Sequence, residues 1–123
     1  MTGPIKAKRT EVYLAAQLRQ VLKGITIKKA ADLAIAYEPV WAISTSKQAH
    51  PSSPEEADST QAFIKKTARQ ILGCEVRVLY GGSVKVSNAE SFLEKKHIDG
   101  LLIGATSLEA TDFAAIVNGK NKK

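Results

Sequence analysis

The sequence predicts an α/β fold of about three parallel strands and four helices. Short apolar segments alternate with longer amphipathic ones, and short turns rich in glycine and proline separate them without a low-complexity linker. Because strand and helix alternate three times, we expect parallel strands joined by right-handed crossovers, as in a (β/α) barrel or an open doubly wound sheet. Three such strands alone leave two unpaired edges and one poorly covered face.

The composition is that of an ordinary soluble globular chain. Its 123 residues are 44% hydrophobic and 24% charged, enough for one domain, or a piece of a larger one, with a real core. The net charge of +6 is explained by solvated lysines near both termini or by an affinity for anions, but no stripe of aromatic and basic residues indicates nucleic acid. The single cysteine, Cys74, excludes an internal disulfide, and its apolar neighbours predict a buried thiol.

No apolar segment reaches the roughly 18 residues of a membrane span, and the N-terminus lacks an apolar signal core. We therefore expect a cytoplasmic protein.

The first predicted elements are a helix and a strand. Apolar residues recur at helical spacing over residues 10–22, between a possible N-cap at Thr10 and a stop at Gly24. Residues 34–37 are short, apolar and followed by a proline, which predicts a strand buried on both faces.

The second helix has the clearest boundaries. Ser53 offers an N-cap, Pro54 suits the first helical position, and Glu56 completes a capping box. Helix is therefore predicted to about Leu72, with Gly73 closing it.

The rest of the chain repeats this pattern. A second capping box, Ser87 to Glu90, predicts a helix that reaches about Lys96, and a last helix should stop at Asn118-Gly119. The predicted elements are a strand at 76–80, a helix at 87–96, a strand at 99–103 and a helix at 109–117.

Unusual residues follow all three predicted strands, at the ends where function collects in both architectures. Glu38 follows the first strand, Gly-Gly-Ser (81–83) the second and Gly-Ala (104–105) the third. Small residues there let backbone amides approach an anion, and the next helix N-terminus adds a favourable dipole. Two interpretations stay open: a phosphate site, or tight turns without a ligand.

Glu38 also has two interpretations. A glutamate at a strand end is often an ion-pair partner or a solvated turn residue. Its setting favours a base, since Pro39 restricts the Glu38 backbone and the apolar Trp41 and Ile43 could exclude water. A partly desolvated carboxylate suits removal of a proton beside a carbonyl.

Three motifs resemble triosephosphate isomerase, specifically its C-terminal half. They are AYEPVWAI (36–43), YGGSV (80–84) and IDGLLIGATSL (98–108), in the family's order over nearly the whole chain. The resemblance implies a partial TIM (β/α)8 barrel, in which residues 1–123 form a single domain without the N-terminal half.

The resemblance also implies roles for individual residues. Glu38 matches the catalytic base that interconverts dihydroxyacetone phosphate and glyceraldehyde 3-phosphate, in glycolysis and gluconeogenesis, without a cofactor or metal. Residues 39–49 match a lid that closes over the substrate. Backbone amides that bind the phosphate are implied at Ser44, Ser83, Gly104 and Ala105. The lid and the groups that clamp the base or latch the lid are implied at Pro39, Trp41, Ile43, Thr45, Ser46, Lys47, Tyr80 and Leu102.

The chain departs from the family pattern in three places. Ser44 and Ser46 replace lid glycines, and Ala105 replaces the second glycine of the last phosphate loop. Where such a position needs a positive φ, a β-carbon costs about 1–2 kcal/mol; where φ is negative, it stiffens the loop. Lys65 stands where the family has an arginine that pairs with the aspartate matching Asp99, which predicts a looser tie.

The family's catalytic lysine and electrophilic histidine belong to the half that this chain does not match. His97 precedes a strand, at the stability face of a barrel, and His50 matches no catalytic position. We therefore expect the isolated chain to be nearly inactive, and to need an N-terminal half or to self-associate, as the family is homodimeric. The alternatives are another phosphate-binding barrel or half-barrel enzyme, and a non-catalytic anion-binding module.

Overall fold

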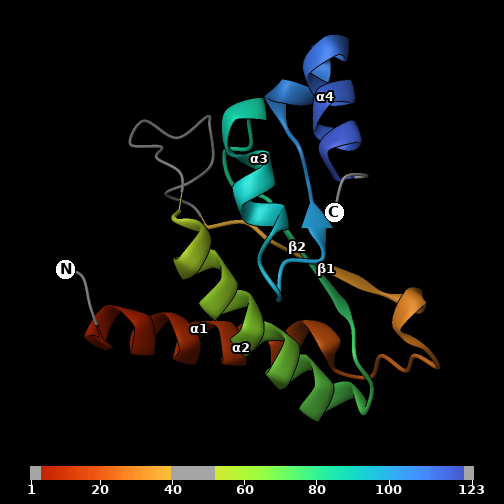
Figure 1. Ribbon diagram of the computed structural model, residues 1–123. Helices are drawn as coiled ribbons and strands as arrows, with labels where there is room; N and C mark the ends of the chain where they lie inside the picture. The colour runs from red at the N-terminus through yellow and green to blue at the C-terminus, as the bar shows by residue number, and fades with distance from the viewer. Residues whose placement is uncertain (1–3, 40–51, 121–123) are drawn as a thin grey trace.

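The computed structural model describes residues 4–39 and 52–120 as a parallel three-stranded sheet with four α-helices (Figure 1). Three of the predicted site segments, the end of β1, the loop after β2 and the loop after β3, lie within these residues. The elements are α1 (Pro4–Leu22), a 3-10 turn (Ala30–Asp32), β1 (Ala34–Tyr37), α2 (Pro54–Leu72), β2 (Arg77–Tyr80), α3 (Val86–Leu93), β3 (Gly100–Leu101), a second 3-10 turn (Ala105–Leu108) and α4 (Ala110–Lys120).

The sheet has the strand order β1-β2-β3, and both strand pairs are parallel, as predicted. Ala36 lies opposite Leu79, and Tyr80 lies opposite Leu101. Parallel pairing in sequence order brings the three carboxyl ends to the same edge of the sheet. Figure 1 shows α2 crossing α1 on one side of the molecule, with α3 and α4 toward the other end.

Local signals set the boundaries of α2, and the prediction for it is confirmed. The Ser53 side chain accepts a hydrogen bond from the Glu56 amide at 3.1 Å, which satisfies one of the free donors at the helix start. At the other end Gly73 adopts a left-handed conformation, with φ of 81°, and its N–H donates to the Arg69 carbonyl at 2.8 Å.

Other boundaries differ from the predictions because other groups cap the elements. Helix α1 begins at Pro4, not Thr10, since proline suits a first helical position. Helix α3 begins after Lys85, not at Ser87, because the Asn88 side-chain oxygen accepts from the Lys85 amide at 2.8 Å. Strand β3 has two residues, not five, and the flanking residues make single hydrogen bonds to β2 instead.

The prediction that β1 is buried on both faces is wrong. Ile35 and Tyr37 point toward the helices and are partly or fully buried, whereas Ala34 and Ala36 are exposed. On β2, Arg77, beside Ala34, is exposed as well. Among the described residues, these exposed side chains form a second face, opposite the face that α2 and α3 contact.

The core lies between the helices and the first face of the sheet. Val78 and Tyr80 of β2 are fully buried, and the Tyr80 ring stacks on Phe92 of α3 with centroids 4.2 Å apart. The other buried apolar residues of this core come from all four helices, strand β1 and the loops: Leu18, Leu22, Tyr37, Ala57, Ile64, Ala68, Val76, Val84, Ala89, Ile98 and Ile116.

Polar contacts join α2 to the sheet. Lys65 pairs with Asp99 at 2.7 Å, as expected, through a single nitrogen instead of a guanidinium fork. The same Asp99 oxygen accepts from the buried Val78 amide at 2.9 Å.

His97 makes a second contact between α2 and the strands. Its N–H donates to Asp58 at 2.8 Å, and its ring nitrogen Nδ1 lies 3.2 Å from the same carboxylate oxygen. Because His97 precedes β3, it lies at the amino end of the strands. This placement gives it a structural role far from the carboxyl ends.

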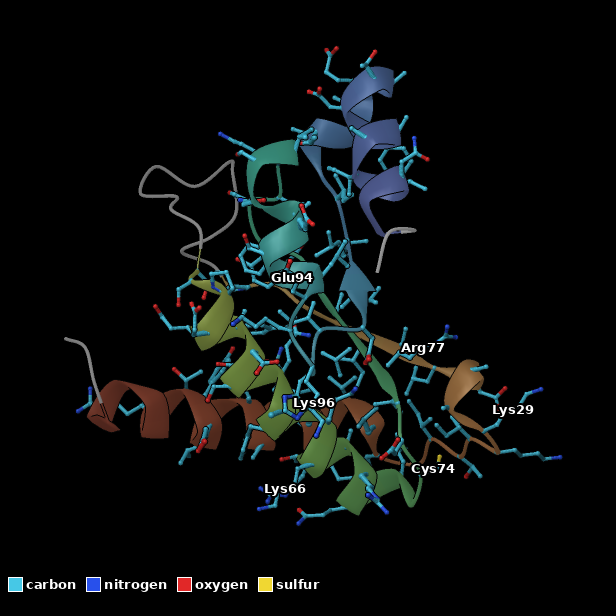
Figure 2. All side chains as sticks on the ribbon, viewed as in Figure 1. Lys29, Lys66, Cys74, Arg77, Glu94 and Lys96 are labelled. Atoms are coloured by element: carbon cyan, nitrogen blue, oxygen red, sulfur yellow. The ribbon has the colours of Figure 1, made fainter. Side chains whose placement is uncertain are left out.

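Cys74 lies in the connection from α2 to β2, shortly before Arg77 (Figure 2). Cys74 is partly exposed, not buried as predicted; it follows Gly73, the residue that ends the helix, and precedes the strand. Over residues 4–39 and 52–120, no helix has both the length and the apolar character that crossing a membrane requires.

Candidate functional site

A cavity of about 300 Å³ lies at the carboxyl ends of the three strands. Its walls come from the end of β1, the loop from β2 to α3 and the loop from β3 to α4. The lining residues are Glu38, Gly81, Gly82, Ser83, Val84, Lys85, Leu102, Ile103, Gly104, Ala105 and Thr106. The structure thus brings together the predicted base and the two predicted anion loops.

Glu38 is packed directly against Gly81. A β-carbon added to Gly81 would lie 2.8 Å from Glu38 Cγ and 3.5 Å from its carboxylate oxygen Oε1. The Gly81 N–H donates to the Tyr37 carbonyl at 2.8 Å, which continues the pairing of β1 and β2 by one residue. Gly81 therefore leaves the space that the Glu38 side chain occupies.

The neighbours of Glu38 in the chain are both buried, although Glu38 itself is exposed. Tyr37 is only 7% exposed, and burial raises the pKa of Tyr37 to about 12 against the opposing effect of a hydrogen bond with Thr60. Pro39 is buried on the other side. The backbone that carries Glu38 is thus held on both sides, while its carboxylate faces the cavity.

The first anion loop is held by Asn88 of α3. The Asn88 amide nitrogen donates to the Ser83 carbonyl at 2.9 Å, and its oxygen accepts from the Lys85 N–H at 2.8 Å. One side chain therefore fixes both sides of Val84. The exposed Lys85 adds a positive charge to the rim of the cavity.

The second anion loop leads into a 3-10 turn, Ala105–Leu108. The Gly104 carbonyl accepts from the Ser107 hydroxyl at 2.6 Å and from the Ser107 N–H at 2.9 Å. Within the described residues, a positive φ occurs only at Gly24 and Gly73, so Ala105 has a negative φ. Its β-carbon therefore carries no left-handed strain, and it stiffens the loop.

Two further predicted residues lie near the site. Leu102, expected to clamp the base, is 45% exposed and lines the same cavity as Glu38. Tyr80, expected to latch the lid, lies outside the cavity wall, and its hydroxyl oxygen accepts from the Ser52 N–H at 3.3 Å. Burial raises the pKa of Tyr80, and the hydrogen bond from Ser52 opposes that shift.

Most of the predicted lid falls on residues 40–51, outside the described part of the chain. The positions concerned are Trp41, Ile43, Ser44, Thr45, Ser46, Lys47 and His50. Their predicted roles stay predictions, as do the effects of the serines at positions 44 and 46.

Three residues that shape this site are not predicted from the sequence in the roles that they have here. Gly81 is predicted only as part of an anion loop, and no motif singles out Asn88 or the hydroxyl of Thr106. The Thr106 hydroxyl donates to the Val84 carbonyl at 2.7 Å, across 22 positions of sequence. Asn88 could have been found as a possible helix cap, whereas no local signal points to the contacts of Gly81 and Thr106.

The acidic and thiol side chains of the described segments form no group of three that could hold a metal ion. What the arrangement offers is one carboxylate, backbone amides of two glycine-containing loops, and a lysine at the rim. Such a set can bind a small anion and move a proton to or from a carbon atom placed above it.

Comparisons with known proteins point to one family. A family model described as triosephosphate isomerase matches residues 4–120. The triosephosphate isomerase of Clostridium novyi (strain NT) is 45% identical over 117 residues, which cover 92% of this chain and 46% of that protein. The triosephosphate isomerase of Rhodopirellula baltica is 44% identical over 116 residues, covering 91% of this chain and 44% of that protein.

A third relative, the triosephosphate isomerase of Solibacter usitatus, is 45% identical over 114 residues, which are 89% of this chain and 45% of that protein. The chain thus spans about half the length of the curated relatives it matches. The parallel α/β sheet is that of a partial TIM barrel, and this chain belongs to the triosephosphate isomerase family.

Proposed function

We propose that this chain supplies the C-terminal half of a triosephosphate isomerase active site. The reaction is the interconversion of dihydroxyacetone phosphate and glyceraldehyde 3-phosphate, as a step of glycolysis and gluconeogenesis. One observation carries the proposal: a single cavity is lined by Glu38 and by both anion loops, each at a different strand end. The names of the relatives support it.

In the proposed mechanism Glu38 moves the proton. Its carboxylate removes a proton from the carbon beside the carbonyl of one triose and returns it to the adjacent carbon, so that the carbonyl and hydroxyl exchange places. The phosphate would bind at the amides of Ser83, Gly104 and Ala105, and the lid would add that of Ser44. Holding the phosphate on the two loops places the reacting carbons beside Glu38, which converts binding energy into orientation.

Negative charge develops on the substrate oxygens during the reaction and needs an electrophile to stabilise it. We propose that the rest of the barrel supplies this electrophile. A groove of about 710 Å³ runs between α1 and β1, and Glu38 lies in its wall as well as in that of the smaller cavity. Its other walls are mainly apolar, with Tyr13, Leu14 and Leu18 from α1 and Ile35 from β1.

The groove fits a neighbouring strand and helix of a barrel. Among the described residues β1 pairs with β2 alone, so its other edge offers unpaired backbone groups. The chain matches less than half of its relatives' length, and the unmatched part of those proteins is the proposed occupant. It would come from another chain or from further residues of the same protein.

Co-expression tests these proposals together. The partner is the part of the Clostridium novyi relative that precedes the matched region, and the readout is isomerase turnover with and without it. Turnover should be negligible for the chain alone, should rise with the partner, and should fall about 10²- to 10⁴-fold in Glu38→Gln. Robust turnover by the chain alone, or a partnered Glu38→Gln variant as active as the unaltered chain, would contradict the proposal.

The oligomeric state tests the groove separately. Light scattering after gel filtration should show that the chain without the partner self-associates. With the partner it should show a complex of defined mass, because the partner covers the apolar groove. A stable monomer that melts sharply on its own would contradict the proposed docking surface.

We further propose a cytoplasmic location, which the lone cysteine supports and which cell fractionation tests.

A further inference from the structure

Two neighbouring loops of the cavity are joined by one side chain. Residues 81–84 follow β2, and residues 104–106 follow β3. The pairing of these two strands ends where the Leu102 N–H donates to the Tyr80 backbone carbonyl at 2.9 Å. Beyond that point, the hydroxyl of Thr106 donates to the Val84 carbonyl at 2.7 Å. Thr106 is half-buried and Val84 is buried, so water competes little for this bond.

Each loop also has an anchor of its own. Asn88 holds the Ser83 carbonyl of the first loop, and Ser107 holds the Gly104 carbonyl of the second. In a trans peptide the C=O and the following N–H point in opposite directions, so holding the Gly104 carbonyl sets the direction of the Ala105 N–H. These anchors orient each loop internally, but they do not set the distance between the loops.

We propose that Thr106 is a positioning residue, whose hydroxyl holds the loops after β2 and β3 at the separation at which both face one phosphate group. This inference rests on the proposed function, since it takes the anion of the cavity to be a phosphate. In this role the Thr106 hydroxyl acts through the Val84 carbonyl, to which it donates its hydrogen bond. Its β-branched side chain restricts χ1, so the hydroxyl is held toward Val84 at little further entropic cost.

The test uses the full chain and two variants of Thr106. Thr106→Val keeps the shape and removes the hydroxyl, whereas Thr106→Ser keeps the hydroxyl. Thr111→Val, on the exposed surface of α4, is the matched control for exchanging a threonine for a valine. The readouts are backbone hydrogen exchange over residues 81–85 without ligand, and equilibrium dialysis against radiolabelled inorganic phosphate.

Thr106→Val should speed exchange over residues 81–85 and weaken phosphate binding about threefold to tenfold, as loss of one hydrogen bond implies. Thr106→Ser should restore both, which a role in general packing does not predict. Unchanged exchange, or unchanged phosphate binding in Thr106→Val, would overturn the inference. A further outcome separates the two proposals: neither the unaltered chain nor any variant binds phosphate, but Thr106→Val still speeds exchange over residues 81–85. That result would overturn the proposed phosphate site and leave the link between the loops in place.

Discussion

Replacing Gly81 by alanine tests whether the site depends on the close approach of Glu38. The new β-carbon would lie 2.8 Å from Glu38 Cγ, whereas two carbon atoms in contact prefer about 3.5–4.0 Å. The backbone has little freedom to relieve this overlap. The Gly81 N–H is bonded to the Tyr37 carbonyl at 2.8 Å, and that carbonyl oxygen lies 3.4 Å from the new β-carbon.

The Glu38 side chain must therefore move, by about 0.7–1.2 Å if it alone restores the contact. A displacement of about 1 Å at a reacting group can cost about 10²-fold in rate, so we expect kcat to fall about 10- to 100-fold. KM should change little, because the amides proposed to bind the phosphate belong to backbone that is expected to stay in place. The assay is isomerase turnover of the chain complemented by the partner half.

Gly100→Ala is the matched control. Gly100 is also buried at a strand, but its added β-carbon would meet the Leu79 Cδ2 methyl at 3.0 Å instead of Glu38. Both variants carry the general cost of overpacking, about 1–3 kcal/mol, which chemical denaturation measures separately. If Gly81→Ala kept kcat within twofold, or if Gly100→Ala lost as much activity, the close contact would not be what positions the base.

Three further predictions test the framework around the site. Asp99→Ala should lower the free energy of unfolding by about 1–3 kcal/mol, since the buried Val78 N–H loses its acceptor. Lys65→Met should lower it by less than about 1 kcal/mol, because the ion pair is partly exposed. Equal losses of the two variants in urea denaturation would contradict this prediction. The pKa of Tyr37 is raised from 10.0 to about 12, so the folded state holds its proton more tightly. The contribution of Tyr37 to the free energy of unfolding is complete below pH 10 and falls by about 2–3 kcal/mol as the pH rises to 12. In thermal melts across this pH range, the Tyr37→Phe variant should lack that part of the decrease. Ser53→Ala should cost about 1 kcal/mol by removing the N-cap of α2, and Ser53→Asp should restore most of it; a thermal melt unchanged by Ser53→Ala would show that the cap contributes nothing.

Much of the fold follows from short-range signals. The boundaries of α2 were predictable because the cap at Ser53, the proline after it and the left-handed Gly73 all act within a few residues. The prediction for α3 was wrong at both ends: the helix begins one residue early because Asn88 competes with Ser87 as the capping group, and it ends at Leu93 instead of about Lys96. Strand β3 is short because few of its residues find a partner, which depends on how the chain packs.

The sequence by itself determined the order of the elements, the parallel sheet, the family and the segments from which the cavity is built. Only the tertiary structure decided how those segments meet: Glu38 against Gly81, the Thr106 hydroxyl on Val84, and the exposed second face of β1. Periodicity and caps are set by residues within one or two turns of each other, so they can be read along the chain. A contact between residues 22 or 43 positions apart depends on which strands pair and in which register, and that is decided by the packing of the whole sheet.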